Sequence, residues 1–238
     1  MLKNMDDKLR LTWHGHACFT IDTGKKVVVD PFIEGNPVAK VKKDDIKADA
    51  VVISHGHFDH VGDAVYIARK NKAPIVTMVE LAWILGEENK DVQVIGINLS
   101  GSTEVNGIRF TAVPAYHSTG YNGKYGGAAS GFVIEHNGFT LYHAGDTGVF
   151  KDMELIGELY RPQISMLPIG GFYTMSPREA AYAVKMLRSK VTIPMHYNTF
   201  DAIKQDPQKF KVEAEKNGTR VVIMGVEETR EFSRAELT

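Results

Sequence analysis

Three histidines and one aspartate crowd into six positions of this chain, in the stretch HGHFDH that begins at His55. The stretch directly follows an apolar run that is typical of a strand covered on both faces. Imidazole and carboxylate groups are ligands for divalent zinc, manganese, iron or cobalt. His55 and His57 leave an extended segment on the same side because they are two residues apart. Asp59 and His60 fall where the chain turns into a helix, so one short loop can face two metal ions.

Three further candidate ligands each follow a strand-like run, and they are His117, Asp146 and His196. Asp146 lies between Gly145 and Gly148, and glycines allow the backbone to approach a metal closely. A carboxylate has two oxygens and can therefore bridge two ions. The shared position at strand ends indicates that the three belong to one site with the HGHFDH stretch, because open α/β sheets place their sites at the carboxyl ends of strands.

Other polar residues are candidates for a supporting role around the ligands. A metal-bound histidine usually donates its second N–H to a carboxylate or carbonyl, and Asp30, which ends an apolar run, is the candidate acceptor. We place His16 and His143 in the pocket or behind the ligands. Whether His14, His16 or His143 touches a metal stays open at this point.

Short apolar runs separated by turn signals must position these residues. Strands are expected near residues 9–13, 18–21, 27–30, 50–54, 75–78, 107–113, 131–135, 139–143, 164–167, 191–195 and 220–224, and helices at 61–70, 79–85 and 176–189. Strands dominate each half of the chain and helices interrupt them. This order favours an α/β sandwich of two sheets with helices outside over a doubly wound parallel sheet. No internal boundary divides the chain, so we expect one domain over residues 1–238.

The composition is that of an ordinary globular protein. The chain has 238 residues, 43% hydrophobic and 24% charged, with a formal net charge of −1. The near-neutral charge argues against nucleic acid and against a basic membrane patch. No apolar run approaches the ~20 residues that a membrane span needs, and residues 1–10 lack the apolar core of a signal peptide. One cysteine allows no intrachain disulfide, so we expect a cytoplasmic protein.

The motifs HGHFDH, AYHS, AGDTG and MHYN, in this order, resemble those of the metallo-β-lactamase superfamily over residues 13–196. The stretches TWHGHACF, DPF and YHAGDTG further resemble a branch of bacterial and archaeal metal-dependent hydrolases whose relatives include ascorbate-phosphate lactonases. The resemblance implies a four-layer αββα sandwich, two mixed β-sheets flanked by helices, with the site at one edge. It implies one metal on His55, His57 and His117, a second on Asp59, His60 and His196, and Asp146 as the bridge.

Two such ions ~3.5–4 Å apart can share a water and lower its pKa, and the metal-bound hydroxide would attack a carbonyl carbon or a phosphorus. We therefore expect a metal-dependent hydrolase of a small ester, lactone or phosphate ester. Asp59 is the expected catalytic residue, which orients the nucleophile or moves its proton. Zinc is the first expectation for the two ions, and manganese is the alternative because the site has no sulfur ligand.

Two other functions fit the same motifs. The first is a nuclease or phosphodiesterase on the same fold, and the second is a di-iron redox or sensor protein. The expected partner is a small-molecule substrate, and a homo-oligomer is compatible with the sequence. The glycine-rich loop at residues 118–130 is either a plain connection or a lid. As a lid, it would place Tyr121 and Tyr125 over the metals and Lys124 on an anionic group of the substrate.

Overall fold

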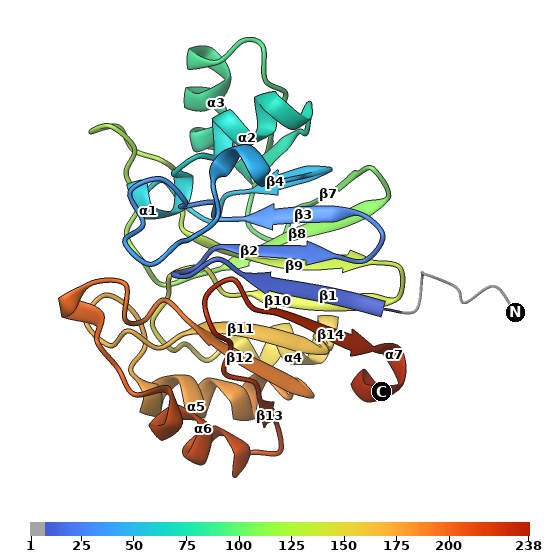
Figure 1. Cartoon of the computed structure of the whole chain (residues 1–238), viewed down its shortest axis with the longest axis vertical. Helices are drawn as coiled ribbons and strands as arrows, with labels where there is room; N and C mark the ends of the chain where they lie inside the picture. Colours follow the sequence, from blue (N-terminus) through green and yellow to red (C-terminus); the bar gives the residue numbers. More distant parts are fainter. Residues whose placement is uncertain (1–7) are drawn as a thin grey trace, which may run out of the picture.

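The computed structural model describes residues 8–238, and in it two seven-stranded sheets pack against each other with helices outside (Figure 1). The first sheet has the order β14 (Thr229–Ser233), β1 (Lys8–Trp13), β2 (Phe19–Asp22), β3 (Lys26–Val29), β4 (Ala50–Val52), β5 (Ile75–Met78), β6 (Val94–Ile97). The second has the order β13 (Arg220–Val221), β12 (Val191–Met195), β11 (Ile164–Pro168), β10 (Phe139–His143), β9 (Ser130–His136), β8 (Ile108–Pro114), β7 (Ser102–Val105). Each sheet combines parallel and antiparallel pairs, so the expected sandwich of two mixed sheets is confirmed.

Helices cover the outer face of each sheet. The first sheet carries α1 (Phe58–Val61), α2 (Ala64–Asn71) and α3 (Val79–Glu88), and the second carries α4 (Met153–Tyr160), α5 (Pro177–Leu187) and α6 (Pro207–Glu215). The short helix α7 (Arg234–Leu237) and two 3-10 turns, Lys43–Asp45 and Asp201–Ile203, complete the elements. No helix in the described part of the chain is long and apolar enough to cross a membrane. The expectation for residues 1–10 concerns a segment whose first seven residues lie outside the described residues.

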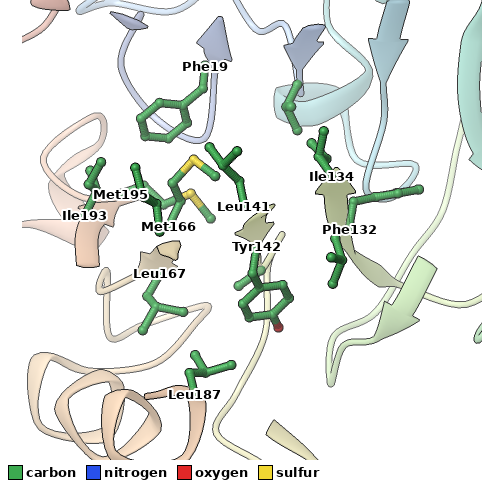
Figure 2. Packing of buried hydrophobic residues seen from close by; sticks show 14 of the residues in the cluster. Phe19, Phe132, Ile134, Leu141, Tyr142, Met166, Leu167, Leu187, Ile193 and Met195 are labelled. Carbon is green, nitrogen blue, oxygen red and sulfur yellow. The ribbon is translucent and has the colours of Figure 1, made fainter. Parts of the chain in front are cut away.

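The hydrophobic core lies between the sheets and beneath the helices. Figure 2 shows Leu141 pointing toward Phe19 of the first sheet, whereas the next residue, Tyr142, points to the opposite side. On that side Leu167 faces Leu187 of α5. This alternation follows from the period of two in a strand. Because the central strands of the second sheet are covered on both faces, β11 and β12 are buried over their whole length.

The local turn and capping signals are confirmed. Asn137 and Gly138 have positive φ values and join β9 to β10 as an antiparallel hairpin. Helix α5 begins at the predicted capping box, in which Ser176 and Glu179 cap each other.

The helix expected at residues 61–70 is wrong as one element. The structure has two helices there, because Gly62 has a φ of 37° and a side chain at this position would meet the Pro31 carbonyl oxygen at 2.5 Å. This break changes the direction of the chain between the HGHFDH loop and α2.

Candidate metal centre

The candidate ligands gather at one edge of the sandwich, where strands of both sheets end. Strands β3 and β4 run parallel, and β10, β11 and β12 run parallel in the other sheet. Parallel strands bring their carboxyl ends to the same edge. Figure 1 shows β3 and β4 ending beside α1, which holds Asp59 and His60. Topology therefore explains why residues far apart in sequence meet here.

His55, His57 and His117 form the first ligand group. Each offers one ring nitrogen, and these atoms all lie within 4.8 Å of one another. His55 Nε2 lies 2.9 Å from His57 Nδ1. Burial lowers the pKa of all three histidines. The group is therefore biased toward neutral imidazoles, the form that binds metals.

Asp59, His60 and His196 form the second group, and the structure adds His16 to it. His16 Nε2 lies 3.1 Å from Asp59 Oδ2, and the rings of His16 and His196 are 3.9 Å apart. Burial and the neighbouring His196 lower the pKa of His16 to about 4. Burial opposes ionisation of Asp59, but the hydrogen bond from His16 and the charge of His60 hold its pKa at about 2. A neutral His16 thus donates from Nε2 to an ionised Asp59, and its Nδ1 accepts from the Thr199 hydroxyl at 2.9 Å.

Asp146 lies between the two groups. Its Oδ2 is 3.0 Å from His196 Nε2 and 3.5 Å from His117 Nε2, and its Oδ1 is 3.3 Å from His60 Nε2. One carboxylate therefore contacts ligands of both groups, which is the position that a bridging ligand needs. A Cβ on the preceding Gly145 would lie 2.6 Å from a backbone oxygen, so only glycine fits this approach.

The polar atoms at the centre of the site fit a divalent cation. His60 Nε2, Asp146 Oδ1 and both ring nitrogens of His196 are buried without a hydrogen-bond partner. Such atoms are costly to bury and normally have partners. Burial opposes protonation of His60, but the nearby Asp146 and Asp30 outweigh it and raise its pKa well above the ordinary value. The buried carboxylates thus require positive charge beside them, and the imidazole and carboxylate donors suit zinc or manganese.

Asp30 supports one histidine of each group. Its fully buried carboxylate accepts hydrogen bonds from His60 Nδ1 at 2.8 Å, from Ser54 Oγ at 2.7 Å and from the Ser54 backbone N–H at 2.7 Å. Because the Ser54 hydroxyl donates to Asp30, it accepts from His55 Nδ1 at 3.0 Å. Once a cation takes the place of the second proton of His60, both histidines are held as Nδ1–H tautomers whose Nε2 atoms face the site. Sequence reasoning placed Asp30 here but missed Ser54, although it directly precedes His55.

The remaining histidines have other partners. His143 Nε2 donates to the Ala17 carbonyl at 2.8 Å, and its Nδ1 accepts from the Gly145 N–H at 3.2 Å. His143 therefore holds the backbone that leads into Asp146 and offers no nitrogen to a metal. His14 lies between Glu227 Oε2 and Thr20 Oγ1, at 2.7 and 2.8 Å.

The loop at residues 118–130 lies against the protein at two points. The Gly56 N–H donates to Thr119 Oγ1 at 3.0 Å, and Lys124 Nζ pairs with Glu88 Oε1 at 2.8 Å. Neither Lys124 nor Tyr121 or Tyr125 is among the described residues that line the cleft at the metal centre. The placement of these three residues gives no support to the lid alternative, in which Lys124 would bind an anionic group of the substrate.

A cleft of about 460 Å³ opens beside the ligands. Besides His57, Asp59, His117 and His196, its lining consists of Phe58, Ser118, Tyr173, Phe200 and Ala202. Sequence reasoning included Ser118 in the candidate lid loop but missed the other four residues. Phe58 lies inside the HGHFDH motif, so its position next to the ligands could have been predicted from the sequence. Tyr173 and Phe200 come from loops that carry no local signal of a pocket.

Comparisons with known proteins show the family to which the chain belongs. The family described as Beta-lactamase superfamily domain matches residues 10–196. A UPF0173 metal-dependent hydrolase of Thermoplasma volcanium is 50% identical, with 94% of this chain and 99% of the relative covered. The corresponding protein of Archaeoglobus fulgidus is 44% identical, with 95% and 100% covered. The solved structure of Igni18, a metallo hydrolase of Ignicoccus hospitalis, has a TM-score of 0.87 and 38% identity, with 95% of this chain and 99% of that chain covered. The chain therefore belongs to the metallo-β-lactamase superfamily, within which it is a metal-dependent hydrolase.

Proposed function

We propose that the chain hydrolyses a small ester, lactone or phosphate-ester substrate with two divalent metal ions as cofactors. The observation that carries the proposal is the position of Asp146, whose two oxygens contact histidines of both ligand groups. One ion would be held by His55, His57 and His117, and the other by Asp59, His60 and His196, with Asp146 shared. A lactone is included because of the sequence resemblance to ascorbate-phosphate lactonases, and a cytoplasmic location belongs to the same proposal.

Bound divalent ions would acidify a water and polarise the bond under attack. The chain itself supplies orientation. Asp30 fixes the tautomers of His55 and His60, and His143 holds the backbone N–H of Gly145 next to Asp146. These contacts preset the ligand geometry before any substrate arrives.

Asp59 is the group proposed to handle the proton of the attacking water. It lines the cleft, and its Oδ2 is held by His16, so the carboxylate is oriented while still within reach of substrate. A pKa of about 2 keeps Asp59 ionised at neutral pH, which suits an oxygen that orients a water by accepting its hydrogen bond.

Metal removal and restoration test the proposal. Purified protein is assayed by elemental analysis and against a panel of carboxylic esters, lactones, thioesters and phosphodiesters. We expect up to two divalent ions per chain, loss of hydrolysis on chelation, and recovery on adding zinc or manganese. Full activity in protein shown to be metal-free would contradict the mechanism. Iron with a characteristic absorption band, in protein without hydrolase activity, would instead support the di-iron alternative.

A further inference from the structure

The cleft beside the metal centre has an aromatic wall, which consists of Phe58, Tyr173 and Phe200. Phe58 is 71% exposed and Tyr173 is 57% exposed. Exposed rings that gather at a cleft mark a binding surface, because scattered single rings are the norm elsewhere. The wall therefore offers apolar area to a ligand that reaches the metal centre.

Buried rings hold two members of this wall from behind. Phe32 is 3% exposed, and its ring centroid lies 5.8 Å from Phe58 and 6.4 Å from Phe200. The ring of Phe200 also lies 5.6 Å from His16, which supports Asp59. Edge and tilted ring contacts of this kind fix ring positions. The wall is thus built on the same scaffold as the second ligand group.

Apart from the proposed metal ions, the described residues that line the cleft provide no cationic side chain for an anionic substrate. None of the described residues that line it is a lysine or an arginine, and it is lined by the carboxylate of Asp59. Proteins usually hold phosphate with arginine, lysine or the N-terminus of a helix. Lys124 is engaged by Glu88, and α1 at the cleft is a single turn of four residues. Apart from the metal centre, apolar contact is therefore the main recognition that this lining offers.

We propose that the substrate is an uncharged carboxylic ester or lactone whose aromatic or branched aliphatic group packs against Phe58, Tyr173 and Phe200. This inference rests on the proposed hydrolytic function and narrows it by excluding phosphate esters. In the reaction, the water oxygen bonds to the acyl carbon and the bond from that carbon to the alkoxy oxygen breaks. One water proton goes to the alkoxy oxygen, and the other is lost when the product acid ionises.

The test uses the metal-loaded protein and a series of phenyl esters with acyl chains of two to six carbons. A phenyl phosphodiester of similar size is the charged comparison. Burial of one methylene raises kcat/KM about fourfold, so kcat/KM should rise steeply along the series and stay far higher than for the phosphodiester. Phe58→Ala and Phe200→Ala should each flatten this slope, with a loss of kcat/KM of roughly 10-fold for the longest ester and a smaller loss for the acetate, which has only its phenyl ring to pack against the wall.

Tyr182→Ala is the matched control, because Tyr182 is a 61% exposed ring of α5 that is not part of the cleft lining. Phe58→Leu should recover most of the increase of kcat/KM with acyl-chain length. This recovery would show that Phe58→Ala loses apolar contact. Three results would overturn the inference while metal-dependent hydrolysis stands. They are a kcat/KM that does not change with acyl-chain length, a phosphodiester that is cleaved faster than every ester, and a chain-length slope in Phe58→Ala equal to that in Tyr182→Ala. Absence of chelator-sensitive hydrolysis for every compound would overturn the proposed function as well.

Discussion

Replacement of Asp30 by asparagine should weaken metal binding, although residue 30 binds no metal in the proposed site. The carboxylate accepts from Ser54 Oγ and His60 Nδ1 on one oxygen and from the Ser54 N–H on the other. An amide can keep the acceptor for the backbone N–H, but its NH2 group then faces the two other donors. His60 must shift its proton to Nε2 to restore a hydrogen bond, and that blocks the nitrogen aimed at Asp146.

The size of the effect follows from the two lost contacts. Each hydrogen bond to a charged group contributes roughly 1.5–3 kcal/mol, so the free energy of unfolding of the metal-free chain should fall by about 3 kcal/mol or more. Loss of an outer partner usually reduces metal affinity about 10–100-fold. Asp30 acts on a histidine of each ligand group. We therefore expect Asp30→Asn to reduce metal affinity by the upper end of this range, about 100-fold or roughly 2.8 kcal/mol. Ser54→Ala removes the hydrogen bond with His55 and leaves the one between His60 and Asp30, so it should reduce metal affinity about 10-fold.

Zinc affinity is measured by competition with a chromophoric chelator, and stability by thermal unfolding in excess chelator. Asp22→Asn is the control, because it makes the same chemical change at a carboxylate that caps the exposed Gly24 N–H at 3.0 Å. If folded Asp30→Asn protein bound both ions within twofold of the unmodified chain, the tautomer argument would fail.

Three further changes separate the site from its surroundings. Asp59→Ala should lower turnover by ~100-fold or more while the chain stays folded. His136 lies outside the ligand groups, with its Nδ1 at 2.6 Å from Thr23 Oγ1, so His136→Ala should leave turnover unchanged. Equal rates in the two variants would refute this division between site and bystander histidines. Gly145→Ala should lower the melting temperature far more than Gly107→Ala. Both glycines have a positive φ, but only a Cβ at Gly145 would meet a backbone oxygen, at 2.6 Å. Equal melting temperatures would refute this packing argument. Lys124→Ala should change KM equally for charged and neutral substrates, and a rise confined to phosphate-bearing substrates would restore its predicted role in anion binding.

Residue type and spacing predicted seven candidate ligands and a sandwich of two sheets, and the family resemblance implied the four-layer order and the division of the ligands between two metals. The reason is that each ligand segment carries its own local signal, a buried apolar run that ends in a histidine or an aspartate. Apolar runs also predict the strands. The topology of two mixed sheets then brings the ligand-bearing ends of these strands together. The seven predicted ligands accordingly lie in interlocking groups.

Only the tertiary structure decided which other residues share the site. A sequence does not show that one carboxylate, Asp30, reaches Ser54 and His60 together, because that depends on how β3 lies beside β4. It also does not show that Glu88 of α3 engages Lys124. Contacts of this kind form between segments that are brought together by packing, and side-chain competition at those contacts leaves no periodic pattern along the chain. The aromatic wall of the cleft arises in the same way, from three segments that are far apart in the sequence and line one cleft in the folded chain.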